Sequence, residues 1–360
     1  MAPHGTQEKG TWRVTRRRSA QHDAVVRSPQ PEPNSIAESR RIVTMDRTES
    51  ARPSERARRP HRMPSPKTLL WDRDGQDWPN REASRFVRTA RLRWHVQQMG
   101  NGPTLLLLHG TGASTHSWRE LAPLLAKSFT VVAPDLPGHG FTETPPREQL
   151  SLRGMAQEIS ELLSALALDP TIVVGHSAGA AIMIRMTLDG AIAPRGLVSL
   201  NGALLPFRGL ATQFFSPLAK LLALNPLVPR LFAWRASDRA AVERLIRNTG
   251  SAIDSTGIDL YHRLVSSPPH VAAALAMMAN WDLETLVRDL PKLKTPLLLV
   301  AGGEDRAVSS DEAFRVRERL PSAKVAYLRG LGHLAHEERP AEVAEVIAEW
   351  VSSLPAASKT

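Results

Sequence analysis

The sequence predicts an α/β protein with a mostly parallel sheet, helices on both of its faces, and a helical cap inserted after the sixth strand. Three observations lead to this prediction. Apolar runs with the length of buried strands alternate with helical segments. One such run enters a Gly-x-Ser-x-Gly turn that leads directly into an apolar helix. The stretch 202–282, by contrast, shows short helical patterns and no strand pattern.

Composition and charge limit the class of protein. Hydrophobic residues make up 42% of the 360-residue chain, and no apolar run approaches the ~18 residues of a membrane span. The absence of cysteine excludes disulfides and thiolate sites and favours a cytoplasmic location. Residues 1–62 hold 14 basic and 7 acidic side chains, so most of the net charge of +10 lies there. The rest of the chain therefore needs no nucleic-acid partner to explain its charge.

The first 62 residues are expected to be a disordered basic tail. They are rich in Arg, Ser, Pro and Glu, and cannot bury enough apolar surface to offset the entropy of ordering. The segment lacks the hydrophobic region of a secretory signal. Two alternatives are an arm that contacts anionic lipid or a partner, and an extension ahead of a true start at Met45 or Met63. The folded domain is then expected to comprise core segments 63–201 and 283–354 around the cap, 202–282.

The elements follow from hydrophobic periodicity. Alternation around 92–96 predicts an antiparallel strand pair, whereas continuous runs such as 104–108 predict strands covered on both faces. Ser151 is placed to cap the helix that follows it. The expected strands cover 83–90, 91–98, 104–108, 129–133, 171–174, 196–201, 296–301 and 324–328. The expected helices cover 117–127, 151–168, 178–188, 311–320 and 341–351, with short cap helices at 218–223, 231–234, 240–246 and 271–279.

Ser177 is the predicted nucleophile. It lies between Gly175 and Gly179, after a β-branched run and before a helix. A turn that tight leaves no room for side chains beside the serine, so its hydroxyl projects over the N-terminus of the helix. The alternative, a glycine-rich turn with an idle serine, is disfavoured by this strand and helix context.

A serine nucleophile needs a base, and the base needs an acid to orient it. In a parallel sheet both come from loops that follow the strands. Asp305 follows the strand that ends at Ala301, and His333 follows the strand that ends at Leu328. Their order after Ser177 is the one expected for this architecture. Glu304 adjoins Asp305 and is the alternative acid.

The oxyanion hole requires two convergent N–H donors. Ala178, directly after the nucleophile, is the first candidate, and Thr111 is the second, with Gly112 as its alternative. Both Thr111 and Gly112 belong to the glycine-containing loop after the strand 104–108.

Other histidines and motifs receive structural interpretations. His176 is expected to pack away from the serine, His336 to lie in a turn beyond the loop, and His109 and His139 to hold loops by hydrogen bonds. No spacing typical of a metal site, a phosphate loop or a dinucleotide fingerprint is present, so no cofactor and no metal are expected. The apolar cap favours a hydrophobic ligand. The cap residues behind that inference are Phe207, Phe214, Phe215, Phe232, Trp234, Met277, Met278 and Trp281.

Together these motifs resemble the α/β-hydrolase superfamily. The resemblance runs from about Ala83 to Trp350 and rests on His109-Gly110, the 135–140 loop, the Ser177 turn, 302–305 and Gly332-His333. Three further stretches, 78–84, 92–97 and 109–118, resemble the magnesium chelatase accessory proteins of bacteriochlorophyll biosynthesis, as do 201–207 and 277–283.

The resemblance implies a role around the insertion of magnesium into protoporphyrin IX. The first hypothesis is a serine hydrolase that cleaves an ester or related acyl bond of a hydrophobic substrate, for which a tetrapyrrole is a candidate. The alternatives are a non-catalytic porphyrin-binding accessory protein and a general carboxylesterase. Magnesium chelatase subunits are the implied partners, and membrane contact is expected to be at most peripheral, at the photosynthetic membrane.

Overall fold

The computed structural model describes residues 11–12, 68–206, 227–235 and 238–355. All of them belong to one of the two units of the chain, that of residues 1–13 and 65–360. Its strands are β1 (Thr11–Trp12), β2 (Ser84–Arg88), β3 (Arg93–Met99), β4 (Thr104–Leu108), β5 (Thr130–Pro134), β6 (Ile172–His176), β7 (Gly196–Leu200), β8 (Leu297–Gly302) and β9 (Lys324–Leu328).

The helices alternate with these strands along the chain. Those of the core are α1 (Trp71–Asp74), α2 (Leu121–Leu125), α3 (Leu152–Ala165), α4 (Ala178–Leu188), α10 (Glu284–Asp289), α11 (Asp311–Arg319), α12 (Ala335–Glu338) and α13 (Pro340–Ser352). Those of the cap are α6 (Leu227–Arg235), α7 (Arg239–Asn248), α8 (Ser255–Val265) and α9 (Pro268–Ala279). Short 3₁₀ helices are η1 (Arg81–Ala83), η2 (Thr115–Trp118), η3 (Arg147–Gln149) and η4 (Leu290–Lys292).

The described strands form one sheet in the order β1-β9-β8-β7-β6-β4-β5-β3-β2. Strands β4 to β9 pair in parallel, whereas β3 pairs antiparallel with both β2 and β5. The predicted mostly parallel sheet is therefore confirmed. The two-residue strand β1 pairs in parallel with β9. The rest of the segment expected to be a disordered tail lies outside the described residues.

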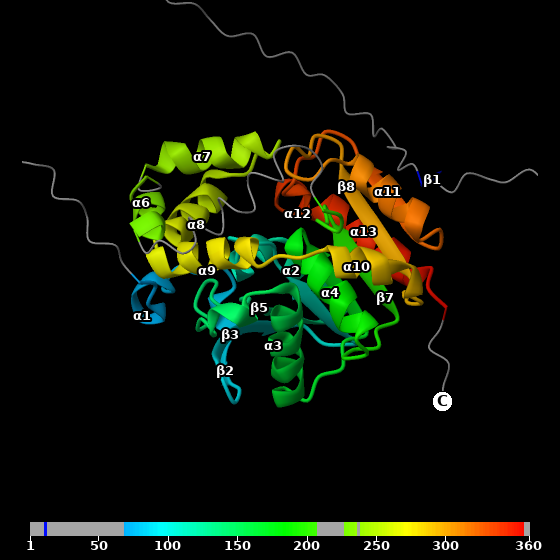
Figure 1. Cartoon of the computed structure of the whole chain (residues 1–360), viewed down its shortest axis with the longest axis horizontal. Coiled ribbons are helices and arrows are strands. Elements are labelled where there is room, and N and C mark those ends of the chain that lie inside the picture. The colour runs from blue at the N-terminus through cyan, green and yellow to red at the C-terminus, as the bar shows by residue number, and fades with distance from the viewer. Residues whose placement is uncertain (1–10, 13–67, 207–226, 236–237, 356–360) are drawn as a thin grey trace, which may run out of the picture. The chain divides into compact units, whose positions relative to one another are not determined.

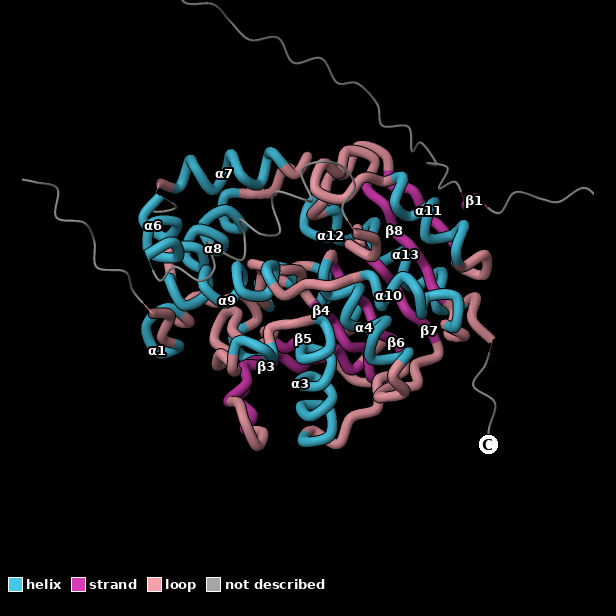
Figure 2. Tube along the Cα trace, in the orientation of Figure 1, coloured by secondary structure: helices cyan, strands magenta, loops and turns pink. Residues whose placement is uncertain are grey.

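Continuous apolar strands supply two cores, one on each face of the sheet. Leu106 and Leu108 of β4 pack with α3 and α4, whereas Leu105 and Leu107 pack with α2 and α13 on the other face. Figure 2 shows strands enclosed between helices in this way. The predicted helices on both faces are therefore confirmed.

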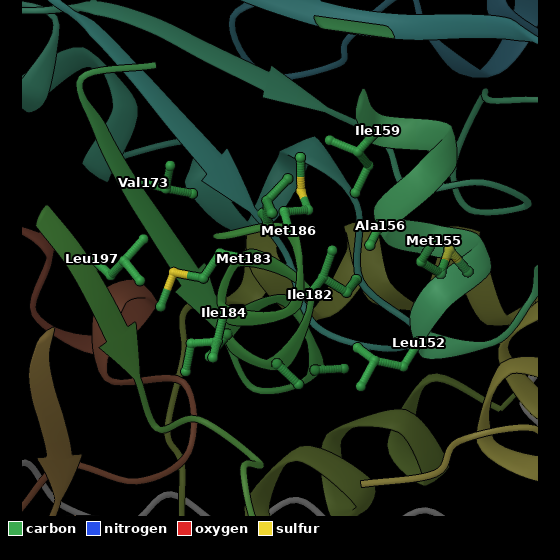
Figure 3. Packing of buried hydrophobic residues seen from close by; sticks show 14 of the residues in the cluster. Leu152, Met155, Ala156, Ile159, Val173, Ile182, Met183, Ile184, Met186 and Leu197 are labelled. Carbon is green, nitrogen blue, oxygen red and sulfur yellow. The ribbon is translucent and has the colours of Figure 1, made fainter. Parts of the chain in front are cut away.

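Helix α4, which begins at the Ser177 turn, lies at the centre of one core. Its residues from Ala178 to Met186 are all buried. Figure 3 shows Ile182 and Met183 among side chains of α3 and of the strands, including Met155 and Leu197. Because this helix is buried on all sides, the position of its first residue is set by the packing of the whole helix.

The cap helices follow β7 and precede β8. In Figure 1, α6, α7 and α8 gather at the upper left, and α9 runs between them and the sheet. The predicted helices at 231–234, 240–246 and 271–279 correspond to α6, α7 and α9. Helix α8 was not predicted, because the β-branched and glycine residues of its first turn weaken the helical pattern. The predicted helix at 218–223 lies outside the described residues.

One core helix also differs from its prediction. The expected helix at 117–127 is divided into η2 and the shorter α2. Helix α10 was not predicted, since it is too short to show a period. None of the helices in the described ranges is both long and apolar enough to cross a membrane.

A buried polar network joins the cap to the core. Arg119 donates one hydrogen bond to Glu337 and another, of 2.8 Å, to Asp254, which caps α8. Tyr261 of α8 donates a hydrogen bond of 2.8 Å to Glu337. Burial raises the pKa of Glu337 to about 7. The cap is therefore held to the core by directional contacts as well as by apolar packing.

Candidate active site

Ser177 lies at the junction of β6 and α4 in a strained backbone conformation. Its φ of 51° and ψ of −115° are outside the regions that a residue with a side chain normally occupies. Its side chain is partly exposed, whereas both of its neighbours in the chain are buried. Such strain persists only where the surrounding packing imposes it, and here β6 and α4 are both part of the core.

The two glycines beside Ser177 are required by close backbone contacts. A Cβ atom on Gly179 would lie 2.1 Å from the carbonyl oxygen of Leu108, and one on Gly175 would lie 2.5 Å from the amide nitrogen of Ala180. Neither contact can be relieved by a side-chain rotation, because each involves backbone atoms. The glycine spacing of the motif therefore reflects the packing of β6, α4 and β4 around one turn.

Asp305 and His333 form a hydrogen-bonded pair. The Nδ1 atom of His333 lies 2.8 Å from Oδ2 of Asp305, and Oδ1 of Asp305 accepts the amide hydrogens of Ala307 and Val308, each at 2.8 Å. Because the carboxylate is an acceptor, Nδ1 carries the proton and Nε2 of His333 keeps its lone pair. Glu304, the alternative acid, is exposed and makes no contact with His333.

The loop after β4 lies directly against the serine. A Cβ atom on Gly110 would be 3.0 Å from Cβ of Ser177 and 2.8 Å from Nδ1 of His176. Within the described part of the chain, no protein acceptor takes the amide hydrogens of Thr111, Gly112 or Ala178. The predicted oxyanion residues therefore offer free donors on two segments next to Ser177.

His176 packs beneath the site. It is buried, and its Nε2 donates a hydrogen bond of 2.9 Å to the backbone carbonyl of His333. The ring of His336, on α12, lies 4.5 Å from that of His176 and is also buried. Burial lowers the pKa of both histidines, and that of His336 falls to about 3. Both rings are thus neutral packing elements at neutral pH.

His109 and His139 hold loops, as expected from the sequence. His109 donates from Nδ1 to the carbonyl of Gly110 and accepts at Nε2 from the amide of Leu136, both at 2.8 Å. His139 donates to the carbonyl of Pro137 at 3.1 Å. Burial lowers the pKa of each ring, so both stay neutral.

A second His–Asp pair lies outside the site. His95 and Asp135 are fully buried and joined by a hydrogen bond of 2.8 Å. Asp135 also accepts the amide hydrogens of Thr115 and Phe141, at 2.7 and 2.9 Å. Burial opposes the charge of Asp135, but His95, His109 and the amide of Phe141 outweigh it and hold the pKa of Asp135 well below its usual range. The pair anchors the 135–140 loop and is enclosed by aromatic rings, with no serine among its contacts in the described residues.

Residues of the cap contact the loops that carry Asp305 and His333. The carbonyl of Thr249 accepts the amide hydrogens of Arg306 and His333, at 3.0 and 3.4 Å. The hydroxyl of Ser251 accepts the amide hydrogen of Leu334 at 2.8 Å. Gly332 is required here, because a Cβ atom on it would lie 2.3 Å from the carbonyl of Gly250. The cap thus takes part in shaping the site.

The apolar cap residues named from the sequence are only partly described. Met277 is buried, Met278 is exposed, and Trp281 packs partly buried against the core. The remaining five lie outside the residues or side chains that the structure describes. They are Phe207, Phe214, Phe215, Phe232 and Trp234.

Comparison with known proteins places the chain in a family. The model of the alpha/beta hydrolase family matches residues 105–346, which include every candidate site residue. This chain belongs to the alpha/beta hydrolase family. The fold, predicted from the alternation of strands and helices and from the Gly-x-Ser-x-Gly turn, is thereby confirmed.

Individual relatives of this chain carry different names. The magnesium-chelatase 30 kDa subunit of Rhodobacter capsulatus is 38% identical over 277 residues, which cover 76% of the chain and 96% of that protein. A pyrrolizixenacetamide deacetylase of Xenorhabdus hominickii is 31% identical over 68% of the chain and 88% of its own length. A laboratory-evolved potato epoxide hydrolase superposes with a TM-score of 0.63 at 19% identity, covering 75% and 99% of the two chains. That likeness concerns the fold.

Sequence reasoning missed three residues that shape the site of this hydrolase-family chain. Asn201 follows β7 in a left-handed conformation with φ 47° and donates a hydrogen bond of 2.8 Å to Oδ2 of Asp305. Ser251 and His270 contact the site loops from the cap. A left-handed non-glycine residue invites attention, but φ cannot be read from a sequence.

Proposed function

We propose that the chain is a serine hydrolase that cleaves an ester or related acyl bond of a hydrophobic substrate. Ser177 is the nucleophile, His333 the general base and Asp305 the acid that orients it. The observation that carries the proposal is the Asp305–His333 hydrogen bond, which leaves Nε2 of His333 free to accept a proton. The strained turn at Ser177 and the adjoining free amides support it further.

The reaction follows from these roles. The hydroxyl oxygen of Ser177 attacks the acyl carbon while Nε2 of His333 takes the hydroxyl proton. The bond to the leaving group then breaks, and the leaving group takes that proton from His333. Water attacks the acyl-serine in the same manner, again giving a proton to His333. The carboxylic acid departs and Ser177 recovers its proton.

Asp305 and the free amides have supporting roles. The carboxylate of Asp305 accepts three hydrogen bonds besides that of His333, from Asn201, Ala307 and Val308. These hydrogen bonds fix the orientation of the carboxylate, whose role is to stabilise the imidazolium rather than to take its proton. The amide of Ala178, with that of Thr111 or Gly112, would stabilise the oxyanion.

The biological setting rests on relatives. The relative of 38% identity is named as a magnesium-chelatase subunit, and on this ground we place the reaction at the magnesium insertion stage of bacteriochlorophyll biosynthesis, with a tetrapyrrole as candidate substrate. Chelatase subunits are then its partners, and the protein is cytoplasmic with at most peripheral contact to the photosynthetic membrane. The relative named as a deacetylase supports acyl-bond chemistry.

A second candidate function is non-catalytic. The name of the 38% identical relative is that of a subunit, which favours an accessory protein that binds or hands over a porphyrin. The third candidate function is that of a general carboxylesterase, because the fold alone does not decide the function.

A fluorophosphonate probe tests the chemistry directly. We expect it to label Ser177 of the folded full-length chain, and Ser177→Ala to abolish labelling. Asp305→Asn should slow labelling by about 10³-fold or more, since the imidazole loses the partner that orients it. Glu304→Gln is the matched control, because its exposed carboxylate lies one residue away without contacting His333. An unlabelled wild-type protein would refute a working nucleophile.

Complementation separates the catalytic from the accessory function. The host is a bacteriochlorophyll-making strain that lacks its own homologue of this chain. The wild-type chain should restore pigment, whereas Ser177→Ala, confirmed as folded and equally abundant, should not. Full restoration by Ser177→Ala would reject the catalytic proposal and leave the porphyrin-binding function.

A further inference from the structure

His270 connects the cap to the loop after β4, which lies against Ser177, and to the 135–140 loop. It lies on α9, is buried, and contacts both loops through its ring nitrogens. Its Nε2 donates a hydrogen bond of 3.1 Å to the carbonyl of Gly112, and its Nδ1 accepts one of 3.1 Å from the amide of Gly140. One ring from the cap thus bridges the loop after β4 and the 135–140 loop.

Both hydrogen bonds require a neutral ring with its proton on Nε2. A carbonyl can only accept and an amide can only donate, so the two contacts assign the tautomer. Burial lowers the pKa of His270 to about 4. The ring of His139 packs edge-on against it at 5.2 Å. The bridging state is therefore the one present at neutral pH.

The bridge contacts the loop after β4 at a glycine. Gly112 has a φ of 78°, and an added Cβ atom would meet no described atom within 4 Å. A glycine in open space is held by little but its hydrogen bonds. The carbonyl of Gly112 is anchored by His270, while its amide hydrogen stays free.

The same helix contacts the loops at two more points. The hydroxyl of Thr111 lies 3.6 Å from the sulfur of Met277. Gly138, in the second loop, is required because a Cβ atom there would lie 2.5 Å from Cβ of Ala273. His270, Ala273 and Met277 are spaced by three and four residues, so they share one face of α9. That face of α9 packs against the loop after β4 and the 135–140 loop.

We propose that His270 is a positioning residue: by holding the carbonyl of Gly112, it fixes the loop so that the amide hydrogen of Thr111 or of Gly112 faces the oxyanion formed on the substrate of Ser177. This inference rests on the proposed function, and it makes the cap part of the catalytic apparatus. His270 contacts a loop carbonyl and is assigned no contact with the substrate. Loss of its hydrogen bond should therefore lower the rate of acyl transfer and leave substrate affinity almost unchanged.

Two conservative variants separate the two hydrogen bonds. The amide nitrogen of His270→Gln can still donate to Gly112, whereas the amide oxygen of His270→Asn can still accept from Gly140. We expect His270→Ala and His270→Asn to lower the labelling rate of Ser177 by about 10-fold to 100-fold, the size of effect expected from a misplaced donor. His270→Gln should stay within about 3-fold of the wild type. With a p-nitrophenyl ester, the loss should appear in kcat and not in KM.

Asn280→Ala is the matched control. Asn280, at the end of the same helix, donates a hydrogen bond of 3.0 Å to the carbonyl of Arg147, away from the Ser177 loops. Its loss should weaken the seating of α9 without changing the labelling rate. If Asn280→Ala slows labelling as much as His270→Ala, the effect is general and the positioning role is rejected.

Hydrogen exchange gives a readout that needs no catalysis. The amide of Ala113, which donates to the carbonyl of Gly110 at 3.2 Å, reports the order of the loop. Its exchange should be about 10-fold faster in His270→Ala and His270→Asn than in the wild type and His270→Gln. Equal exchange in all four proteins overturns the inference. A wild type that is never labelled rejects the proposed function, and exchange alone then decides the role of His270.

Discussion

The side chain of His176 donates a hydrogen bond of 2.9 Å to the backbone carbonyl of His333. The residue that precedes the candidate nucleophile therefore holds the residue that is its candidate base. The end of β6 and the loop after β9, whose contacting residues are 157 positions apart in the chain, meet through this contact. Through this contact His176 belongs to the site although it is not one of the candidate catalytic residues.

Replacing His176 should weaken both the fold and the site. His176→Ala leaves the carbonyl of His333 without its donor and a cavity beneath Ser177. We expect a loss of about 2–4 kcal/mol in the free energy of unfolding, measured with urea. His176→Gln keeps a donor and should recover part of the loss. An alanine variant as stable as the wild type would show that the hydrogen bond contributes little.

Asn201→Asp tests the contact between Asn201 and Asp305. A second carboxylate 2.8 Å from Oδ2 would repel the first, and we expect a loss of about 2–4 kcal/mol in stability at neutral pH. A proton shared by the two carboxylates relieves the repulsion. The loss of unfolding free energy relative to the wild type should therefore become smaller as the pH falls from 7 to 5.

Asn201→Gly is the control for that variant. It keeps the left-handed backbone and loses the side-chain hydrogen bonds to Asp305 and Gly332, so it should lower the unfolding free energy by about 1–2 kcal/mol at every pH. Urea unfolding at several pH values measures both variants. A deficit of Asn201→Asp that does not change with pH would contradict the shared proton.

His336 should make the protein sensitive to acid. Its pKa is about 3 in the folded state, because burial opposes its charge, against about 6.5 in the unfolded chain. Between these values the unfolded state binds a proton that the folded state does not. Stability therefore falls as the pH falls from about 6.5 towards 3, by about 1.4 kcal/mol per pH unit for this one group.

His336→Phe should remove that contribution. Neither ring nitrogen of His336 makes a hydrogen bond to a described residue, and the ring packs 4.6 Å from that of Trp118, so an apolar ring fits the site. Between pH 8 and 5 the unfolding free energy of His336→Phe should change less steeply with pH than that of the wild type. The difference in slope should correspond to up to one bound proton. At pH 8 the difference in unfolding free energy between His336→Phe and the wild type reports packing alone. An unchanged slope would mean that His336 is not the group that titrates.

Gly179→Ala tests the steric basis of the Ser177 turn. The new methyl group would overlap the carbonyl of Leu108, so we expect a loss of at least about 3 kcal/mol in unfolding free energy. Gly190→Ala is the matched control, since Gly190 has a φ of 73° but no described atom near its added Cβ. Its cost should be about 1 kcal/mol, from backbone strain alone. Equal losses would show that the clash at Gly179 is relieved by movement.

The elements with strong local signals were predicted from the sequence. The run at 104–108 and helix α4 match their predicted spans, since a buried strand or helix must be apolar over its whole length. Helix α8 and the division of 117–127 into η2 and α2 were missed. Their boundaries are set by long-range contacts, among them the hydrogen bond from Arg119 to the residue that caps α8.

By itself, the sequence determined the order of strands and helices, the glycine-flanked turn at Ser177, and the two loops that carry Asp305 and His333. These features are local, because they depend on hydrophobic period and on whether a side chain fits a turn. Only the tertiary structure decided that Asp305 rather than Glu304 contacts His333, and that Asn201 and His270 hold the surrounding loops. Each of those contacts joins residues distant in the chain, and such pairs are brought together only when the whole sheet and its cap have packed.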